Sequence, residues 1–158
     1  MIEIRLYREG DAAACAALFY RAVQEGAAGH YSPEQRDAWA PYPELPPDIL
    51  ARFDWRLAQE ITWVAEEDGA IEGFMSLRQD GYLDMAYVAP ERMGTGLAGE
   101  LYKKIKASAR KLSLNILTTE ASHLARPFFA RRGWELMAEQ QVERRGVLIP
   151  NFKMKKVL

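Results

Sequence analysis

Apolar and polar residues alternate in several short segments, and each is predicted to be a β-strand because successive side chains of a strand face opposite sides. The first segment covers 2–7, where Ile2, Ile4 and Leu6 share one side. The other predicted strands are 61–66, 71–78, 82–88, 114–119, 134–143 and 147–155. The chain is therefore expected to form a sheet of about seven strands.

Apolar residues at the spacing of a helical face occupy much of the remaining chain. A helix is predicted over 12–25 with Asp11 as its cap, and another begins after Ser32, which forms a capping box with Gln35. The remaining predicted helices cover 48–59, 96–111 and the segment from Pro127 to Arg132, ended by Gly133. The elements thus follow the order β-α-α-α-β-β-β-α-β-α-β-β.

That order predicts a mixed sheet with helices on its faces. Asp68-Gly69 and Asp80-Gly81 separate the three central strands, and Asp-Gly between strands favours tight two-residue hairpin turns. A helix separates 82–88 from 114–119, so these two strands should pair in parallel through a right-handed crossover.

Composition narrows the class of protein. The 158 residues are 49% apolar and 27% charged with a net charge of −1, which is typical of one soluble globular domain, 1–158, and offers no argument for nucleic acid or an acidic membrane. Cys15, the single cysteine, lies on an apolar helical face, so we expect it to be buried and no internal disulfide to form. No segment has the apolar length of a signal peptide or a membrane span. We expect a cytoplasmic protein.

Residues 82–101 carry the strongest functional signal. The apolar strand from Tyr82 to Val88 leads over Pro90 to Gly94-Thr95-Gly96, where a helix begins. Backbone N–H groups at such a helix start have no intrahelical partner and favour an anion, most often a phosphate.

Three phosphate-bearing ligands compete for this turn. A Walker nucleotide loop is excluded because no Gly-Lys-Ser/Thr ending is present. Residues 94–99 match the dinucleotide fingerprint Gly-x-Gly-x-x-Gly, and Glu120 ends the next strand, where a ribose-binding acid belongs. The preceding antiparallel hairpins and the single β-α step that follows argue against this reading, which leaves NAD-linked redox chemistry as a minor alternative.

The third ligand is coenzyme A. Val88-Ala89-Pro90, the turn from Met93 to Ala98, and the later run Phe128-Phe129-Ala130-Arg131-Arg132-Gly133-Trp134 resemble motifs of the GNAT superfamily of acyl-CoA N-acyltransferases. The resemblance extends over essentially the full chain, and 118–129 with 142–146 and 151–154 is similar to one bacterial subgroup. Met93 stands where the family signature has Gln or Arg.

The resemblance implies an α/β fold with a mixed, mostly antiparallel sheet of about seven strands, helices on both faces and a splay between the fourth and fifth strands. It implies direct transfer of an acetyl group from acetyl-CoA to a primary amine of a small molecule, peptide or protein, with no metal. It further implies no nucleic acid or membrane partner, and it leaves a homodimer open.

The resemblance also implies which residues bind coenzyme A. The pyrophosphate would lie on the N–H groups of 94–98, the pantetheine beside Tyr87 and Val88, and the 3′-phosphate near Arg92 and Arg126, unless these two are ordinary surface arginines. The full expected set is Ala86, Tyr87, Val88, Arg92, Met93, Gly94, Thr95, Gly96, Leu97, Ala98, Ser122, Arg126, Phe128 and Phe129. For Ser122 the alternative is a helix N-cap.

Direct transfer requires a group that accepts a proton from the ammonium of the acceptor. Asp84 is the first candidate because it interrupts an apolar strand, where partial burial should raise its pKa. Glu120, at the end of the fifth strand, is the second, and His123 is a weaker third. For either carboxylate the alternative is a structural ion pair or an exposed strand end.

Phe129 departs from the family pattern, because many members have a tyrosine there that protonates the leaving thiolate, and phenylalanine has no proton to donate. Tyr82, Tyr87 or Tyr102 could replace it, solvent could protonate the thiolate, or the protein could bind acyl-CoA without turnover. Tyr82 is carried forward as a candidate catalytic residue.

The acceptor site is expected in the least regular part of the chain, 26–47, together with the last hairpin. Tyr31 and Trp39 are the principal candidates to line it. His30, Tyr42 and Tyr82 are further aromatic or polar candidates, and packing beneath a proline-rich loop is the alternative for each.

Overall fold

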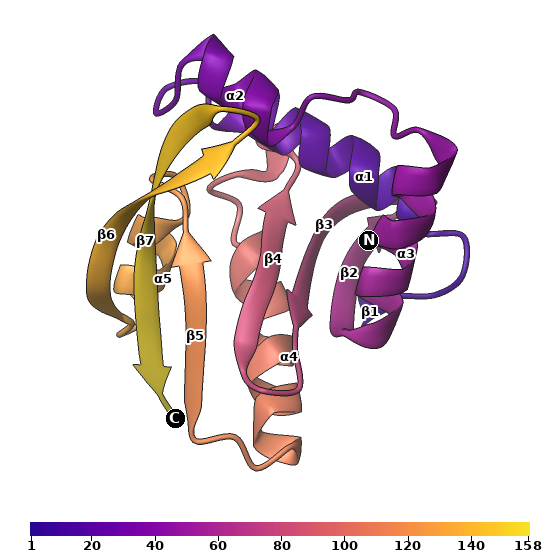
Figure 1. The fold of residues 1–158 in the computed structure, drawn as a ribbon. Coiled ribbons are helices and arrows are strands. Elements are labelled where there is room, and N and C mark those ends of the chain that lie inside the picture. The colour runs from indigo at the N-terminus through magenta and orange to yellow at the C-terminus, as the bar shows by residue number, and fades with distance from the viewer.

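Seven strands form one sheet in the computed structural model, which describes residues 1–158 (Figure 1). The strands are β1 (Glu3–Leu6), β2 (Ile61–Glu67), β3 (Ala70–Leu77), β4 (Tyr82–Val88), β5 (Ile116–Ala121), β6 (Glu135–Arg144) and β7 (Val147–Val157). Their spatial order is β1-β2-β3-β4-β5-β7-β6, and every neighbouring pair is antiparallel except β4 with β5. The predicted mixed sheet and its one parallel pair are confirmed.

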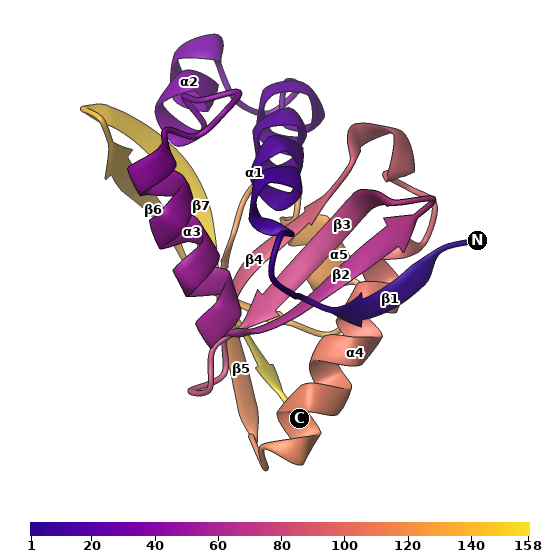
Figure 2. The ribbon, with the colours of Figure 1, turned by 90° about the vertical axis from the view of Figure 1, so that its right-hand side faces the viewer.

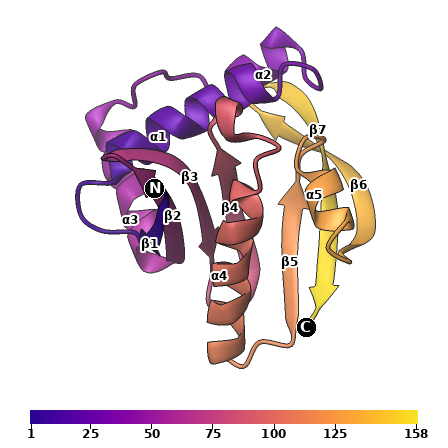
Figure 3. The same ribbon diagram turned by 180° about the vertical axis from the view of Figure 1, so that it is seen from behind.

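Helices cover both faces of this sheet, as expected. They are α1 (Ala12–Arg21), the π-helical turn η1 (Ala22–Gly26), α2 (Pro33–Trp39), α3 (Pro47–Gln59), the 3-10 turn η2 (Pro90–Arg92), α4 (Leu97–Lys111) and α5 (Arg126–Ala130). Figure 3 shows α4 and α5 in front of the sheet, and Figure 2 shows the sheet between α4 and the pair α1 and α3. None of these helices combines the length and the apolar character needed to cross a membrane.

The core is divided by the sheet into two layers, and the alternation along β3 explains the division. Phe74 packs with Leu18 of α1 and Leu57 of α3, whereas its neighbour Met75 packs with Leu101 of α4 on the other face. Adjacent strand residues point to opposite faces, so the continuous apolar run of β3 supplies both layers. This central position of β3 fixes β4, which carries the site described below.

The parallel pair is short, and β4 and β5 diverge beyond it (Figure 1). Only Tyr82 pairs with Thr118 and Leu83 with Thr119, so 84–88 have no partner on β5. The register of β3 against β4 also shifts: Leu77 opposes Leu83 and Ser76 opposes Met85, which leaves the intervening residue of β4 without a partner on β3. That residue is Asp84, and such a β-bulge redirects side chains, often beside functional sites.

The two Asp-Gly turns differ. Asp68 and Gly69 both have positive φ, 52° and 82°, and form the expected two-residue turn. The second turn is longer than predicted, because Arg78 N–H donates to Tyr82 O and encloses three residues, 79–81. Gly81 has φ 95° and its carbonyl accepts from Thr118 N–H at 3.0 Å, so contact with β5 shapes this loop.

The two predicted helix caps also differ. Ser32 and Gln35 form the expected capping box at α2. Asp11 precedes α1 but its carboxylate makes no cap hydrogen bond, because Arg5 and the Arg8 N–H hold it instead. The prediction that the Asp11 carboxylate caps α1 is therefore wrong, because Arg5 on β1 binds the same carboxylate.

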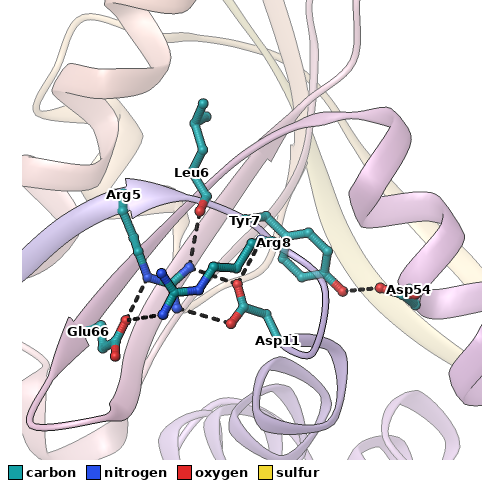
Figure 4. A network of polar contacts seen from close by, with 7 residues as sticks. All are labelled: Arg5, Leu6, Tyr7, Arg8, Asp11, Asp54 and Glu66. Carbon is teal, nitrogen blue, oxygen red and sulfur yellow. Dashed lines mark hydrogen bonds and ion pairs between the residues drawn. The ribbon is translucent and has the colours of Figure 1, made fainter.

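Arg5 is the centre of a polar network that ties β1 to β2 and α1 (Figure 4). It donates to Asp11 at 2.8 and 3.0 Å and to Glu66 at 2.6 Å, and its side chain is only 12% exposed. Burial opposes the charge of Asp11, but the hydrogen bonds from Arg5 and Arg8 and their charges hold the pKa of that carboxyl below its usual value. Every charge in this network has a partner.

Candidate active site

Two pockets meet at the splay between β4 and β5. Pocket A, of about 220 Å³, is lined by Ala22, Ala27, Trp39, Met75, Ala86, Tyr87, Val88, Met93, Gly94, Ala98, Ser122, Leu124, Ala125, Phe128, Phe129 and Arg131. Pocket B, of about 270 Å³, is lined by Phe19, Tyr31, Trp39, Arg56, Tyr82, Asp84, Met85, Tyr87, Glu120, Ser122, Val142, Arg144, Ile149, Pro150 and Asn151. Trp39, Tyr87 and Ser122 line both pockets, so the two are neighbours across these side chains.

Pocket A brings together nine of the residues expected to bind coenzyme A. These are Ala86, Tyr87, Val88, Met93, Gly94, Ala98, Ser122, Phe128 and Phe129. Trp39, which was predicted for the acceptor site, also lines this pocket; the other lining residues were not predicted from the sequence, and several are small: Ala22, Ala27 and Ala125. The cluster of alanine and glycine at 26–29 is the signal that could have indicated an open channel there, because small side chains leave space.

The glycine-rich turn at the mouth of α4 has the geometry of an anion site. Gly94 and Gly96 have φ of 76° and 89°, a left-handed conformation that side chains disfavour, and no atom lies within 4 Å of where a Cβ would sit. The N–H groups of Gly94 and 96–99 donate to no acceptor in the protein. Together with the positive end of the α4 dipole, these free donors favour a phosphate.

The two arginines predicted to bind the 3′-phosphate make contacts outside pocket A. Arg92 forms ion pairs with Glu67 and Glu72, and the guanidinium of Arg126 lies over the ring of Phe152 at 4.4 Å. Neither lines pocket A, and neither do Thr95, Gly96 and Leu97 of the expected set.

Two other arginines approach pocket A or the start of α4. Arg131 lines pocket A and forms no ion pair, and Arg132 stacks on Phe128 with its guanidinium 3.7 Å from the ring centre. Its Nη2 would lie 2.9 Å from a Cβ placed on Gly99, at the start of α4. Their position one residue after the aromatic pair was the available signal in the sequence.

The aromatic residues differ in their relation to the pockets: Phe129 belongs to the core and also lines pocket A, whereas Tyr102 belongs to the core alone. Phe129 is 1% exposed and packs on Trp134 at 4.8 Å between ring centres. Tyr102 accepts a hydrogen bond from the Trp134 indole at 2.9 Å and lines neither pocket. Tyr87, by contrast, lines both pockets, and burial raises the pKa of its phenol. This hydroxyl therefore stays protonated through the neutral range.

Pocket B contains all three residues predicted to be catalytic, Asp84, Glu120 and Tyr82, and both predicted to contact the acceptor, Tyr31 and Trp39. The last hairpin supplies further lining residues, as expected. The Tyr31 hydroxyl already donates to Pro150 O at 2.8 Å and accepts from His123 N–H at 2.9 Å. It offers an aromatic face rather than a free hydroxyl, while His30 and Tyr42 lie outside the pocket.

Asp84 does not have the raised pKa that the sequence suggested. Arg56 donates to it from Nε at 2.6 Å and from Nη2 at 2.5 Å. Burial alone would raise the pKa of Asp84, but hydrogen bonds from Arg56 and Glu60 and the Arg56 charge lower it. The expectation was wrong because the partner lies 28 residues away on α3, where nothing local indicates the contact.

Glu60, which follows α3, was missed by the sequence reasoning. Its side chain is 8% exposed, and burial together with the nearby Asp84 raises its pKa to about 7. It lines a third, polar hollow, pocket C, formed by Trp55, Arg56, Gln59, Glu60, Arg78, Gln79 and Asp84. A glutamate between a helix and a strand gave no signal in the sequence, because such positions usually face solvent.

Glu120, Tyr82 and Ser122 complete the polar lining. Glu120 is exposed on β5, forms no ion pair, and lies 3.5 Å from the Tyr82 hydroxyl. Burial, then the charges of Glu120 and Asp84, raise the pKa of Tyr82 to about 12. The Ser122 hydroxyl accepts from Ala125 N–H at 3.1 Å in the turn before α5, whose N-cap is Ala125 rather than Ser122, and the residue lines both pockets.

No group of three or more histidine, cysteine, aspartate or glutamate side chains is placed to hold a metal ion. The doubly wound parallel sheet that the dinucleotide alternative requires is also absent, because β4 and β5 form the single parallel pair. The structure thus provides an apolar channel, a turn with free backbone N–H donors and a polar chamber beside them.

Comparisons with known proteins agree with this arrangement. Residues 27–158 match the family model described as Acetyltransferase (GNAT) domain. An uncharacterized N-acetyltransferase of Escherichia coli K12, YafP, is 39% identical over 154 residues, which cover 98% of this chain and 95% of that protein. Residues 1–26 precede the family match but supply β1 and α1, which pack against β2 and β3.

Solved structures give the same fold. A GCN5-related N-acetyltransferase from Rhodopseudomonas palustris superposes with a TM-score of 0.90 at 34% identity, covering 99% of this chain and 95% of that one. PaiA N-acetyltransferase from Thermoplasma acidophilum, solved with coenzyme A, superposes with a TM-score of 0.78 at 17% identity, covering 100% and 99%. The second likeness concerns the fold alone.

Proposed function

Because the chain belongs to the GNAT acetyltransferase family, we propose that its two pockets hold the two substrates of acetyl transfer, acetyl-CoA in pocket A and an amine in pocket B. The family defines the reaction: the protein is an N-acetyltransferase that uses acetyl-CoA. One observation carries the division of the pockets. They meet at Trp39, Tyr87 and Ser122, where β4 has left β5, so an acetyl group in one can be reached from the other.

The coenzyme A half of this proposal fits the residues present. The free N–H groups of Gly94 and 96–99 would bind the pyrophosphate, and Arg131 and Arg132 would add positive charge beside it. The pantetheine would run through the apolar channel along Ala86 and Val88. Backbone groups of β4 that have no partner on β5 would bind the pantetheine amides and the thioester carbonyl.

Tyr87 is the hydroxyl donor in this proposal. Phe129 lies in the core, and Tyr102 is engaged with Trp134 away from both pockets. Tyr87 remains protonated at neutral pH and lines the junction of the pockets, so it would donate a hydrogen bond to the departing sulfur. It thereby takes the place of the tyrosine that Phe129 replaces.

The acceptor is a primary amine of a small molecule or a peptide. Pocket B combines the aromatic faces of Tyr31 and Trp39 with the unpaired carboxylate of Glu120. Glu120 would attract the ammonium, and the aromatic rings would enclose its stem. A volume of about 270 Å³ accommodates a small amine or one terminus or side chain of a peptide, rather than a folded surface.

Release of coenzyme A thiol from acetyl-CoA, measured across a library of amines, tests this proposal. We expect amine-dependent release with at least one acceptor class, together with calorimetric binding of acetyl-CoA. Introducing a bulky residue into the channel with Ala86→Phe should abolish acetyl-CoA binding, whereas Ala28→Ser, outside both pockets, should not. Heat of binding with NADH and none with acetyl-CoA would overturn the proposal, as would the absence of thiol release with every amine.

A further inference from the structure

Two buried carboxyl groups, Glu60 and Asp84, separate pocket B from pocket C. Their side chains are 8% and 6% exposed. Asp84 lines both pockets and Glu60 lines pocket C, so the pair connects the chamber beside Tyr87 with a second opening to solvent. The β-bulge at Asp84 places this carboxylate in the gap, because the residue has no partner on β3.

Only one cation, Arg56, forms ion pairs with these two acids. Arg56 makes both of its short hydrogen bonds to Asp84, at 2.6 and 2.5 Å, and its Nε lies 4.0 Å from Glu60. A buried carboxylate without a partner is costly, so one of the two acids holds a proton when the site is at rest. Glu60 Oε1 is buried with no donor in the protein, which identifies Glu60 as the acid that keeps the proton.

The surroundings of Glu60 agree with a shared proton. The buried Ser76 hydroxyl on β3 lies near Glu60 and makes no hydrogen bond in the protein. Its interaction with Glu60 lowers the pKa of that carboxyl, but the effects that raise the pKa are larger. Burial, then the hydrogen bond and charge of Asp84, raise the pKa of Glu60 to about 7, while Arg56 keeps the pKa of Asp84 low. The remaining charged or titratable neighbours of the pair are Arg78 on the β3–β4 loop and Tyr82 and Tyr87 on β4.

We infer that Glu60 and Asp84 act together as the proton acceptor of the reaction, with the proton entering at Asp84 from pocket B and leaving by Glu60 into pocket C. This inference rests on the proposed function, which supplies the amine. Asp84 would be the group that touches the substrate, and Glu60 acts through it. Paired with Arg56 alone, Asp84 would be a weak base near neutral pH. The neighbouring carboxylate of Glu60 raises the proton affinity of the pair.

The protons balance in this scheme. The acceptor ammonium loses one proton to the ionised pair and becomes a neutral amine. Its nitrogen forms a bond to the thioester carbonyl carbon, the carbon–sulfur bond breaks, and the second nitrogen-bound proton reaches the sulfur through Tyr87 or solvent. Products are the amide, the coenzyme A thiol and the one proton held by the pair, which passes to solvent through pocket C.

Glu60→Gln tests the inference, because glutamine keeps the size and a hydrogen-bond donor but cannot titrate. For the wild type, kcat/KM should rise with pH through about 7, since the pair accepts a proton only once it has lost its own. In Glu60→Gln this rise should disappear and the rate at pH 8 should fall at least tenfold, with KM for acetyl-CoA unchanged. Glu139→Gln, an exposed acid on β6, should leave the profile unchanged.

A variant with the wild-type pH profile would overturn the inference. Carbon-13 NMR titration of the side-chain carboxyls in the unsubstituted protein provides a second measurement that needs neither the variant nor turnover. Glu60 titrating near 7 supports the shared proton, and Glu60 titrating below 5 overturns it. Absence of turnover in the wild type would instead overturn the proposed function, so the two failures are distinguishable.

Discussion

The protein contains two clusters in which one arginine meets two acids, and they differ in how completely the charges are matched. Arg5 forms hydrogen bonds with both Asp11 and Glu66, and Arg8 adds a backbone hydrogen bond to Asp11 and an ion pair with Glu66 (Figure 4). Arg56 forms hydrogen bonds with Asp84, whereas its Nε lies 4.0 Å from Oε2 of the second acid, Glu60. The first cluster lines neither pocket A nor pocket B, and the second borders pocket B.

The difference separates structure from chemistry. A cluster with every charge paired holds its acids ionised, and it ties elements together without exchanging protons. A cluster that is one cation short keeps a proton at neutral pH and can give it up, which is what proton transfer at an amine requires. The same residue types thus have opposite consequences, and the location of each cluster relative to the pockets agrees with its balance of charge.

The largest expected effect on stability comes from Arg5→Ala. Removing it leaves Asp11, whose side chain is 9% exposed, short of its main partner, and loss of one member of a buried ion pair costs about 3 kcal/mol. Urea unfolding should show this loss, while kcat of the folded fraction should stay within twofold of wild type. An equal fall in kcat at a temperature where the variant is folded would contradict the division between the clusters.

Next comes the pH dependence of stability in Glu60→Gln. The folded pKa of Glu60 is raised to about 7, so its contribution is complete below the pKa of the unfolded chain and is lost as pH rises through 7. The variant should gain roughly 1 to 2 kcal/mol over wild type at pH 8 and little at pH 4. Unfolding midpoints at the two pH values measure this.

Asp11→Asn gives the opposite slope and serves as the contrast. The folded pKa of Asp11 is lowered, so its stabilisation is present at neutral pH and is lost as pH falls through that lowered value. The variant should therefore be less stable than wild type at pH 7, with a difference that shrinks toward strong acid. If the stability difference from wild type changed with pH in the same direction for the Asp11 and Glu60 variants, the contrast between the two clusters would be wrong.

Two tyrosines extend the same comparison to hydroxyl groups. Tyr7 donates to Asp54 at 2.5 Å, outside both pockets, and Tyr87 lines the junction of the pockets. Tyr87→Phe should lower kcat about tenfold, because a hydrogen bond to a charged group contributes about 1.5 kcal/mol or more. Tyr7→Phe should instead lower the free energy of unfolding by a similar amount and leave kcat unchanged. Steady-state rates and urea unfolding of both variants distinguish these outcomes.

The smallest effect is expected for Arg8→Ala. Its side chain is 65% exposed and lies 3.7 Å from Glu66, and exposed ion pairs contribute less than about 1 kcal/mol. If urea unfolding shows that the free energy of unfolding falls by less than about 0.5 kcal/mol, Arg5 provides most of the stabilisation of this cluster. A loss as large as that of Arg5→Ala would mean that the exposed arginine matters equally.

Local patterns predicted most of the fold. The alternation in 61–66 and 71–78, the Asp68-Gly69 turn and the Ser32 capping box depend on neighbouring residues, and the structure contains all of them. The second Asp-Gly turn departed from its local preference because β5 lies against Gly81. Asp11 departed from its cap role because β1 brought a guanidinium to it.

The sequence predicted many of the residues that line the two pockets, but not the charge state of Asp84. The glycine-rich turn and the acid on β4 were visible as motifs, and the structure gathers the residues around the two pockets. The charge of Asp84, however, depends on Arg56 on α3 and on Glu60 directly after that helix. Such contacts between distant residues follow from the packing of α3 on the sheet. Local patterns in one sequence do not predict that packing.

Turnover of acetyl-CoA by Asp84→Asn and Asp11→Asn, side by side at pH 8 with a saturating amine, tests the central claim most directly. Asp84→Asn should lower kcat at least about 100-fold while binding acetyl-CoA normally, because the proton acceptor facing pocket B is lost. Asp11→Asn should retain kcat within twofold wherever it is folded. Wild-type turnover in Asp84→Asn would contradict the account.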